Sequence, residues 1–336
     1  MNMKNYTYRQ NNKSLLSKGF VSMLTPLSNI VPAGLPANYL SIVSHLSVYI
    51  ALYISYANNQ LANLGFVIIP VLLLVHVITD KLDGIQARAT KTESALGEFM
   101  DHYFEVFNQG VLVLIVWNLF GIKHDWMVLL VLVVLVLLKM TRFYEQYKAN
   151  MLVKGAFGAF EIKLLMITVL LLCNSESVYS SINAMEIQGV LLVEWILLLV
   201  AAGGILSCVL TIIRVPHLTY GYWMFLGFLL LVSGLSFYSL DSLLAGVIIL
   251  FYGGVYIGKL LMAQLIDGVE RSPGLFAPII LAISFFTEYL HATDIFFILF
   301  IYLLVNILLL IIKTFRALKA EWHWVNPDLP ENTHAD

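Results

Sequence analysis

The sequence predicts an all-α integral membrane protein with about ten transmembrane helices. Apolar segments recur along its 336 residues, and most of them approach the roughly 20 residues that a helix needs to cross a hydrocarbon core. Hydrophobic residues make up 60% of the chain and charged residues only 12%, whereas soluble domains are about 25% charged. Basic residues also concentrate in alternate connections between the apolar segments, which is typical of multi-pass membrane proteins.

Each expected span is an apolar run bounded by polar or turn-forming residues. Gly and Ser interrupt several of these runs, as is common where helices pack closely in lipid. The expected spans, in order, are residues 39–56, 62–79, 103–121, 125–141, 160–174, 189–213, 220–238, 243–264, 275–290 and 294–314.

The distribution of Lys and Arg predicts how the chain is oriented. With the N-terminus in the cytoplasm, all but two of the 19 basic residues fall in cytoplasmic segments; the exceptions are Lys123 in an outer loop and Lys163 inside the fifth span. The positive-inside rule therefore predicts that both termini are cytoplasmic. The N-terminus shows no cleavable signal pattern, and a bacterial inner membrane and an ER-type membrane both fit.

We expect four regions along the chain. Residues 1–20 are polar and basic, and form either an interfacial helix on the anionic leaflet or a frayed tail. Residues 21–275 form a transmembrane domain with the first eight spans and the loop that follows. Residues 276–316 form two further C-terminal transmembrane helices, and residues 317–336 form a polar tail. The net charge of −2 gives no basic surface for nucleic acid, so we expect no nucleic-acid partner.

An acidic cluster lies where the second span ends and the third begins. Asp80 and Asp83 are three residues apart and share one helix face, and Asp101 and Glu105 share another because they are four apart. Glu98 lies on the same face as Asp101. Charges at the edge of a bilayer core are costly unless they pair, bind metal or line a wet cavity. The cluster therefore predicts a functional site at the cytoplasmic ends of spans two and three.

The residues in this stretch suit metal ions and a diphosphate. Facing carboxylates repel unless cations neutralise them, and oxygen ligands suit Mg²⁺, Mn²⁺ or Ca²⁺. Two such ions bridged by carboxylates can clamp a phosphoryl group. Gly84 and Ala87 leave the helix face open, and Gly97 permits close packing before the third span. Arg88 can bind a phosphate through two hydrogen bonds.

The spacing of these residues resembles the motif of the CDP-alcohol phosphotransferases, D-x2-D-G-x2-A-R-x8-G-x3-D-x3-D. The last position has Glu105 where the family has Asp. The remaining positions match, in register, at Asp80, Asp83, Gly84, Ala87, Arg88, Gly97 and Asp101. The chain looks closest to the ten-span choline/ethanolamine phosphotransferase branch.

Weaker similarities to that branch extend over roughly residues 20–275. The run LPANYLS, with Asn38 and Ser41, resembles a signature that precedes its first span, and Glu161 matches an acidic residue in its fifth. Two further departures stand out. Leu170 takes the place of a His of the fifth span, and an Asp-Gly-Val run at 267–269 replaces an Ala-His-Met-like run.

The resemblance implies transfer of a phospho-alcohol from a CDP-alcohol to an acceptor hydroxyl, with release of CMP. We expect CDP-ethanolamine or CDP-choline as the donor and a lipid hydroxyl as the acceptor, with diacylglycerol as the default and ceramide as another candidate. The resemblance also implies two Mg²⁺ or Mn²⁺ ions and a homodimer surrounded by membrane lipids. The implied metal ligands are Asp80, Asp83, Asp101 and, in part, Glu105.

The remaining residues of the expected site bind substrate or move a proton. Glu105 is the expected general base, with Glu98 or His102 as the base if Glu105 only binds metal. The expected substrate-binding residues are Asn38, Gly84, Ala87, Arg88, Gly97 and Glu161.

Three other functions stay open at this stage. The roles of the substrates can be reversed, so that CDP-diacylglycerol donates to a soluble alcohol such as inositol phosphate, glycerol phosphate or serine. The protein can also be a homologue that binds CDP-alcohol without turnover, because of Glu105. A cation transporter is the third alternative, although the acidic residues have no counterpart in spans six to ten.

Overall fold

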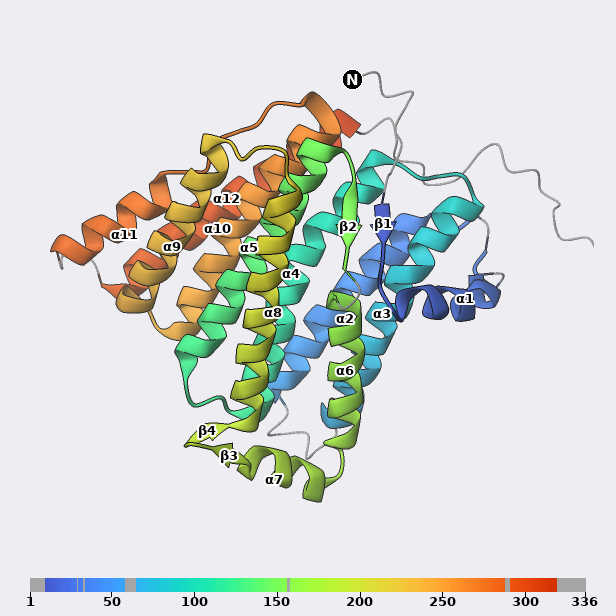
Figure 1. The fold of residues 1–336 in the computed structure, drawn as a ribbon, viewed down its shortest axis with the longest axis horizontal. Helices are drawn as coiled ribbons and strands as arrows, with labels where there is room; N and C mark the ends of the chain where they lie inside the picture. The colour runs from blue at the N-terminus through green and yellow to red at the C-terminus, as the bar shows by residue number, and fades with distance from the viewer. Residues whose placement is uncertain are drawn as a thin grey trace, which may run out of the picture.

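The computed structural model describes residues 10–28, 30–32, 34–57, 65–155, 158–287 and 291–318. Helices dominate these residues (Figure 1), and short strands pair between β1 and β2 and between β3 and β4. The helices are α1 (Ser17–Ser28), α2 (Ala37–Ala57), α3 (Gly65–Ala89), α4 (Ala95–Phe120), α5 (Asp125–Ala149), α6 (Ala159–Leu172), α7 (Glu176–Ala184), α8 (Leu192–Arg214), α9 (Tyr220–Ser239), α10 (Ser242–Met262), a π-helical turn η3 (Ala263–Asp267), α11 (Phe276–Thr287) and α12 (Ala292–Leu318). The strands are β1 (Gln10–Asn12), β2 (Leu152–Lys154), β3 (Glu186–Ile187) and β4 (Val190–Leu191).

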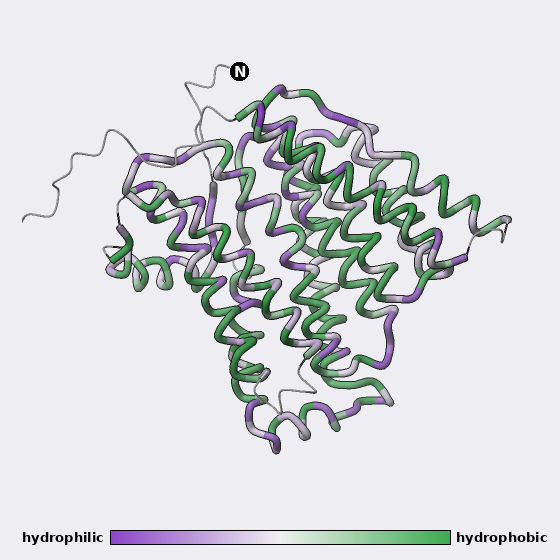
Figure 2. Tube along the Cα trace, turned by 180° about the vertical axis from the view of Figure 1, so that it is seen from behind, coloured by the Kyte–Doolittle hydropathy of each residue, from purple (hydrophilic) through white to green (hydrophobic). Residues whose placement is uncertain are grey.

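The predicted all-α membrane fold is confirmed. Within the described part of the chain, eight helices are long and apolar enough to cross a membrane. The hydrophobic residues follow these long helices, and hydrophilic residues are most frequent near their ends and in the connections (Figure 2). The protein is therefore an integral, multi-pass membrane protein.

The expected count of ten spans is not confirmed. The fifth expected span is α6, which has 14 residues and meets α7 at an angle of 116°. The ninth is α11, which has 12 residues, too few to cross a hydrocarbon core as a regular helix. Counting α6 and α7 as one broken span gives up to nine. Apolar composition alone could not separate a full span from a short or bent helix.

Parts of several expected elements lie outside the described residues. These are residues 1–9 of the N-terminal segment, 62–64 of the second span, 288–290 of the ninth and 319–336 of the tail. The described end of the N-terminal segment includes the start of α1, which lies across the direction of the long helices and beside α3 (Figure 1). Four large hydrophobic side chains within α1 or just before it are exposed: Leu15, Leu16, Met23 and Leu27. An interfacial helix exposes such side chains to the membrane.

Helix α10 occupies the centre of the bundle. It packs against α4, α5, α9 and α12, and most of its length is buried. Small residues permit this close approach, since Gly253 faces Val136 of α5 and Gly254 faces Phe107 of α4. One continuous hydrophobic core joins α10 to α2 through α4. Residues of α3, α4 and α5 all belong to this core, and the same helices carry the polar residues of the site.

Replacing Gly253 by Ala tests this packing. An added Cβ would lie 2.3 Å from Cγ1 of Val136, so we expect a loss of stability of roughly 1–3 kcal/mol from overpacking. The measurement is the thermal unfolding temperature in detergent. The control is Gly227→Ala in α9, where nothing lies within 4 Å of the added methyl group. Equal unfolding temperatures for the two variants would contradict the close helix contact.

Candidate active site

A tight turn brings the two acidic helix faces together. Helix α3 continues to Ala89, beyond the expected end of the second span, and Lys91 adopts a left-handed conformation with φ of 55°. Ser94 then caps α4, and its side chain accepts a hydrogen bond of 3.1 Å from the amide of Gly97. Both ends of the acidic stretch are therefore helical. The turn leads directly from the carboxyl end of α3 into α4, and α2 packs against both helices.

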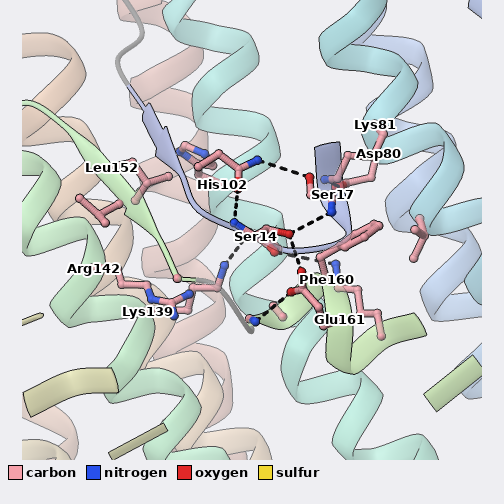
Figure 3. Close-up of a pocket in the computed structure, with 18 of the residues that line it drawn as sticks. Ser14, Ser17, Asp80, Lys81, His102, Lys139, Arg142, Leu152, Phe160 and Glu161 are labelled. Atoms are coloured by element: carbon pink, nitrogen blue, oxygen red, sulfur yellow. Dashed lines mark hydrogen bonds and ion pairs between the residues drawn. The ribbon is translucent and has the colours of Figure 1, made fainter. Parts of the chain in front are cut away.

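Two adjoining cavities lie at this end of the bundle. The first, called here the motif cavity, has a volume of about 190 Å³. The second, called here the basic cavity, has a volume of about 80 Å³ and is shown in Figure 3. Asp80, Lys81 and His102 line both cavities. The structure thus forms one site with two compartments.

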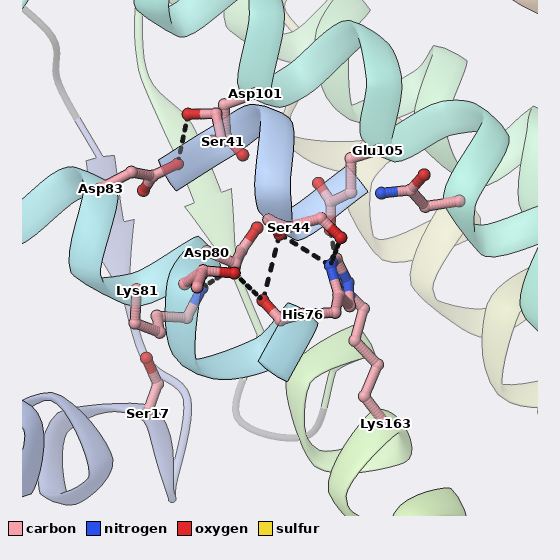
Figure 4. Close-up of polar contacts among 12 residues, drawn as sticks. Ser17, Ser41, Ser44, His76, Asp80, Lys81, Asp83, Asp101, Glu105 and Lys163 are labelled. Carbon is pink, nitrogen blue, oxygen red and sulfur yellow. Dashed lines mark hydrogen bonds and ion pairs between the residues drawn. The ribbon is translucent and has the colours of Figure 1, made fainter. Parts of the chain in front are cut away.

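The motif cavity contains most of the residues that the sequence identifies. Asp80 and Asp83 come from α3, Asp101 comes from α4, and Figure 4 shows all three close to the carboxyl end of α3. Asp83 accepts a hydrogen bond of 2.6 Å from the hydroxyl of Ser41 in α2. Asp80 forms an ion pair of 2.5 Å with Nζ of Lys81. The other expected site residues that line this cavity are Asn38, Gly84, Ala87, Arg88, Gly97, Glu98 and His102.

The small residues of the motif leave space for polar neighbours. An added Cβ at Gly97 would lie 3.4 Å from the amide oxygen of Asn38, at the start of α2. One at Gly84 would lie 3.4 Å from Nη1 of Arg88, so this guanidinium group extends along the open face of α3. Arg88 is exposed at the rim of the cavity. The arrangement presents a cationic group and open backbone beside three carboxylates.

Glu98, in the first turn of α4, forms a buried pair with His102 one turn further along the helix. Oε1 of Glu98 accepts a hydrogen bond of 2.6 Å from Gln146 of α5 and lies 3.6 Å from Nδ1 of His102. Nε2 of His102 lies 3.7 Å from Asp101. The imidazole therefore lies between two carboxylates and has access to both cavities.

Glu105 lines the basic cavity and is not among the residues lining the motif cavity. Its Oε2 accepts a hydrogen bond of 2.5 Å from Nζ of Lys139 in α5, and its Oε1 lies 3.8 Å from Nζ of Lys163 in α6. Sequence spacing grouped Glu105 with the three aspartates. The structure instead turns its longer side chain toward two lysines.

A buried polar chain supports Lys163. Its ammonium group donates a hydrogen bond of 2.9 Å to Nε2 of His76, a fully buried residue of α3. Nδ1 of His76 lies 2.8 Å from the hydroxyl of Ser44 and 3.2 Å from the carbonyl oxygen of the same residue. Since Nε2 accepts a hydrogen bond from the ammonium group, Nδ1 carries the hydrogen of the neutral ring.

Sequence reasoning did not assign site roles to His76, Lys139 and Lys163. Lys139 was one of the basic residues expected on the cytoplasmic side, and Lys163 was an exception inside the fifth expected span. A stronger signal was available, because a histidine and a lysine within apolar spans are costly unless they have partners. The sequence could not show that these partners include one another.

Hydrogen bonds to Glu161 hold the N-terminal segment beside the site. Its carboxylate accepts hydrogen bonds from the hydroxyl of Ser14, from the amide of Leu16 at 3.3 Å and from the amide of Gly158 at 2.9 Å. Strand β1 pairs in parallel with β2, so this segment lies beside the basic cavity (Figures 1 and 3). The expected substrate contact of Glu161 stays a prediction.

The donor set suits a hard divalent cation, although the side chains do not enclose one. Three aspartates line one cavity and offer only oxygen ligands, which Mg²⁺ and Mn²⁺ prefer. The ammonium groups of Lys81 and Lys139 lie against Asp80 and Glu105 and partly balance their charge. Among the described residues, no three acidic, His or Cys side chains converge closely enough to form a complete ion site.

The model of the CDP-alcohol phosphatidyltransferase family matches residues 35–206 of this sequence, which is just over half of the chain. The chain belongs to this family. A comparison with individually curated proteins finds no match. As a CDP-alcohol phosphatidyltransferase, the protein is a transferase that moves a phospho-alcohol from a CDP-alcohol to an acceptor.

The family match includes most of the residues that line the two cavities of this CDP-alcohol phosphatidyltransferase; the lining residues from the N-terminal segment and α1 precede it. It begins just before α2 and ends within α8, so it covers the acidic stretch as well as Lys139 and Lys163. Helices α9 to α12 lie beyond it. The match does not distinguish the choline/ethanolamine branch from other branches of the family.

Proposed function

We propose that the protein transfers phosphoethanolamine or phosphocholine from the CDP-alcohol to a lipid hydroxyl such as that of diacylglycerol, and that it releases CMP on the cytoplasmic side of the membrane. The observation that carries this proposal is the pair of joined cavities. The carboxylates, open backbone and Arg88 of the motif cavity would bind a CDP group, and the adjoining basic cavity, which contains Glu105, would receive the acceptor.

Asp80, Asp83 and Asp101 would hold two Mg²⁺ or Mn²⁺ ions, and Glu105 would share one of them by leaving Lys139. Bound ions would neutralise the diphosphate and polarise its phosphoryl oxygens. The location of the three aspartates in one cavity supports this assignment.

The protein's own residues would orient the two substrates. Gly84 and Ala87 let the diphosphate approach α3 closely, and Arg88 donates hydrogen bonds to a phosphate oxygen. Glu105 then takes the proton of the acceptor hydroxyl. The acceptor oxygen forms a bond to the phosphorus that carries the alcohol, and the bond between that phosphorus and the bridging oxygen breaks. CMP leaves with the bonding electrons, so no covalent enzyme intermediate is required.

His102 is the alternative base. It lines both cavities, whereas Glu98 lies against Gln146 and His102. A proton accepted by His102 would remain next to the carboxylates of Glu98 and Asp101. This geometry favours His102 over Glu98 if Glu105 only binds metal.

One observation favours the reversed pairing as a second candidate. The acceptor side of the site contains several cations, and a polar soluble alcohol suits such a surface better than a neutral glyceride does. In that case CDP-diacylglycerol would be the donor, and its acyl chains would remain in the membrane.

The test is CMP release by the purified full-length protein in detergent. We expect CMP only when a CDP-alcohol, an acceptor and Mg²⁺ or Mn²⁺ are all present, complete loss of release with EDTA, and recovery when either ion is returned. The donor panel contains CDP-choline, CDP-ethanolamine and CDP-diacylglycerol, and the acceptors include diacylglycerol and ceramide. Measurable CDP-choline binding without CMP release under any of these conditions would instead identify an inert homologue.

A further inference from the structure

Lys163 of α6 is a buried cation that donates a hydrogen bond to a neutral acceptor. It is 7% exposed, and its ammonium group lies 2.9 Å from Nε2 of His76 in α3. A carboxylate in the place of His76 would cancel the charge of Lys163, whereas a neutral imidazole accepts one hydrogen bond and leaves the charge unchanged. The ammonium group therefore still attracts Glu105, whose Oε1 lies 3.8 Å from it.

The imidazole ring of His76 is itself held in one orientation. Its Nδ1 lies 2.8 Å from the hydroxyl oxygen of Ser44 and 3.2 Å from the carbonyl oxygen of the same residue. The hydroxyl of Ser44 in turn donates a hydrogen bond of 3.1 Å to the carbonyl oxygen of His76. His76 is fully buried, and α2 packs closely against α3 around it. These contacts fix the position of Nε2, and with it the position of the Lys163 ammonium group (Figure 4).

Glu105 needs such support because its side chain is longer than the Asp of the family motif. The additional rotatable bond gives its carboxylate more positions to adopt. Oε2 accepts a hydrogen bond from Lys139 of α5, and Oε1 faces Lys163. If Glu105 leaves Lys139 to share an ion, as proposed above, Lys163 still holds its carboxylate. A misplacement near 1 Å can lower a reaction rate on the order of 10²-fold, so the position of Lys163 affects the transfer step.

We propose that His76 is a positioning residue for the transfer reaction. It holds the ammonium group of Lys163 beside Glu105, and this ammonium group holds the carboxylate of Glu105 where it receives the proton of the acceptor. The inference rests on the proposed function, in which Glu105 is the base. His76 is not among the residues that line either cavity, so it acts through Lys163 and not on a substrate.

The first experiment compares His76→Asn with His76→Gln in the CMP release assay. The short amide of Asn can replace Nδ1 toward Ser44 but does not reach Lys163, whereas the amide oxygen of Gln can accept a hydrogen bond from Lys163 in place of Nε2. We expect His76→Asn to lower kcat roughly 10- to 10²-fold with an unchanged donor KM. His76→Gln should restore most of that loss. Lys163→Met removes the ammonium group itself and should lower kcat to the same extent.

The matched control is His124→Asn. His124 lies beyond the far end of α4, where it contacts Glu194, and it lines neither cavity. This variant should keep the wild-type kcat. Thermal unfolding and CDP-choline binding show that each variant is folded. A wild-type kcat for folded His76→Asn or for folded Lys163→Met overturns the inference, and so does an equal loss in His76→Asn and His76→Gln.

A second experiment repeats His76→Asn in a Glu105→Asp background. The shorter side chain of Asp places its carboxylate further from Lys163, so His76→Asn should change kcat by less than about twofold there, as expected for independent sites. An equal fold-loss of kcat in both backgrounds overturns the inference.

The same four proteins are also compared by thermal unfolding, which requires no turnover. We expect the two substitutions to change the unfolding temperature non-additively, because both residues act through the ammonium group of Lys163. If the wild type releases no CMP with any donor, the proposed function fails. In that case additive changes in unfolding temperature overturn the link between His76 and Glu105, and non-additive changes support it.

Discussion

Replacing Asp83 by Asn is expected to lower the rate of CMP formation by roughly 10²–10³-fold or more while the protein stays folded. The carboxylate of Asp83 lines the motif cavity with Asp80 and Asp101, where a diphosphate and its metal ions would develop charge during transfer. Removing one group that stabilises such charge typically costs that much in rate. Asn keeps the shape of the side chain and an oxygen that can accept the hydrogen bond from Ser41.

The measurement combines CMP release with thermal unfolding of the same preparation. The control is Asp267→Asn, because Asp267 pairs with Arg271 away from both cavities and should retain the wild-type rate. A folded Asp83→Asn variant that keeps more than a tenth of the wild-type rate would exclude Asp83 from the proposed metal site.

Removing the charge of Glu105 and shortening its side chain are expected to have different effects on turnover. Glu105→Gln removes the proton acceptor, so turnover should fall by roughly 10²–10⁴-fold, the usual contribution of a general base. Glu105→Asp keeps a carboxylate in the cavity and restores the residue that the family motif has at this position, so we expect it to retain or increase turnover.

The measurement is the CMP release rate at saturating donor, with Glu186→Gln as the control. Glu186 is an exposed residue of β3, where it pairs with Lys123. Wild-type turnover by Glu105→Gln would remove Glu105 from the role of base and leave His102 as the residue to change next.

The fold class was predictable because it depends on short-range properties of the chain. Long apolar runs with few charges must be helical in a membrane, since only internal hydrogen bonds can satisfy their backbone there. Most expected spans therefore coincide with helices. The exceptions, α6 and α11, are largely apolar but short. Their lengths depend on packing and on the connections at their ends, which hydropathy does not encode.

The motif cavity was also predictable, because its acidic residues are close together in the sequence. Asp80 and Asp83, and Asp101 in the next helix, are separated by helical spacings that place them on defined faces, and a short turn limits how far apart the two helices can lie. The structure confirms that these residues line one cavity. Their proposed functions as metal ligands remain to be tested by the variants above.

By itself, the sequence determined the membrane class, the helices and the positions of the motif carboxylates, because each follows from residues near one another in the chain. Only the tertiary structure decided what surrounds Glu105. Lys139 and Lys163 approach it from α5 and α6, and His76 supports Lys163 from α3. These contacts join residues 34 to 87 positions apart. No local periodicity links such residues, because their proximity results from how the helices pack.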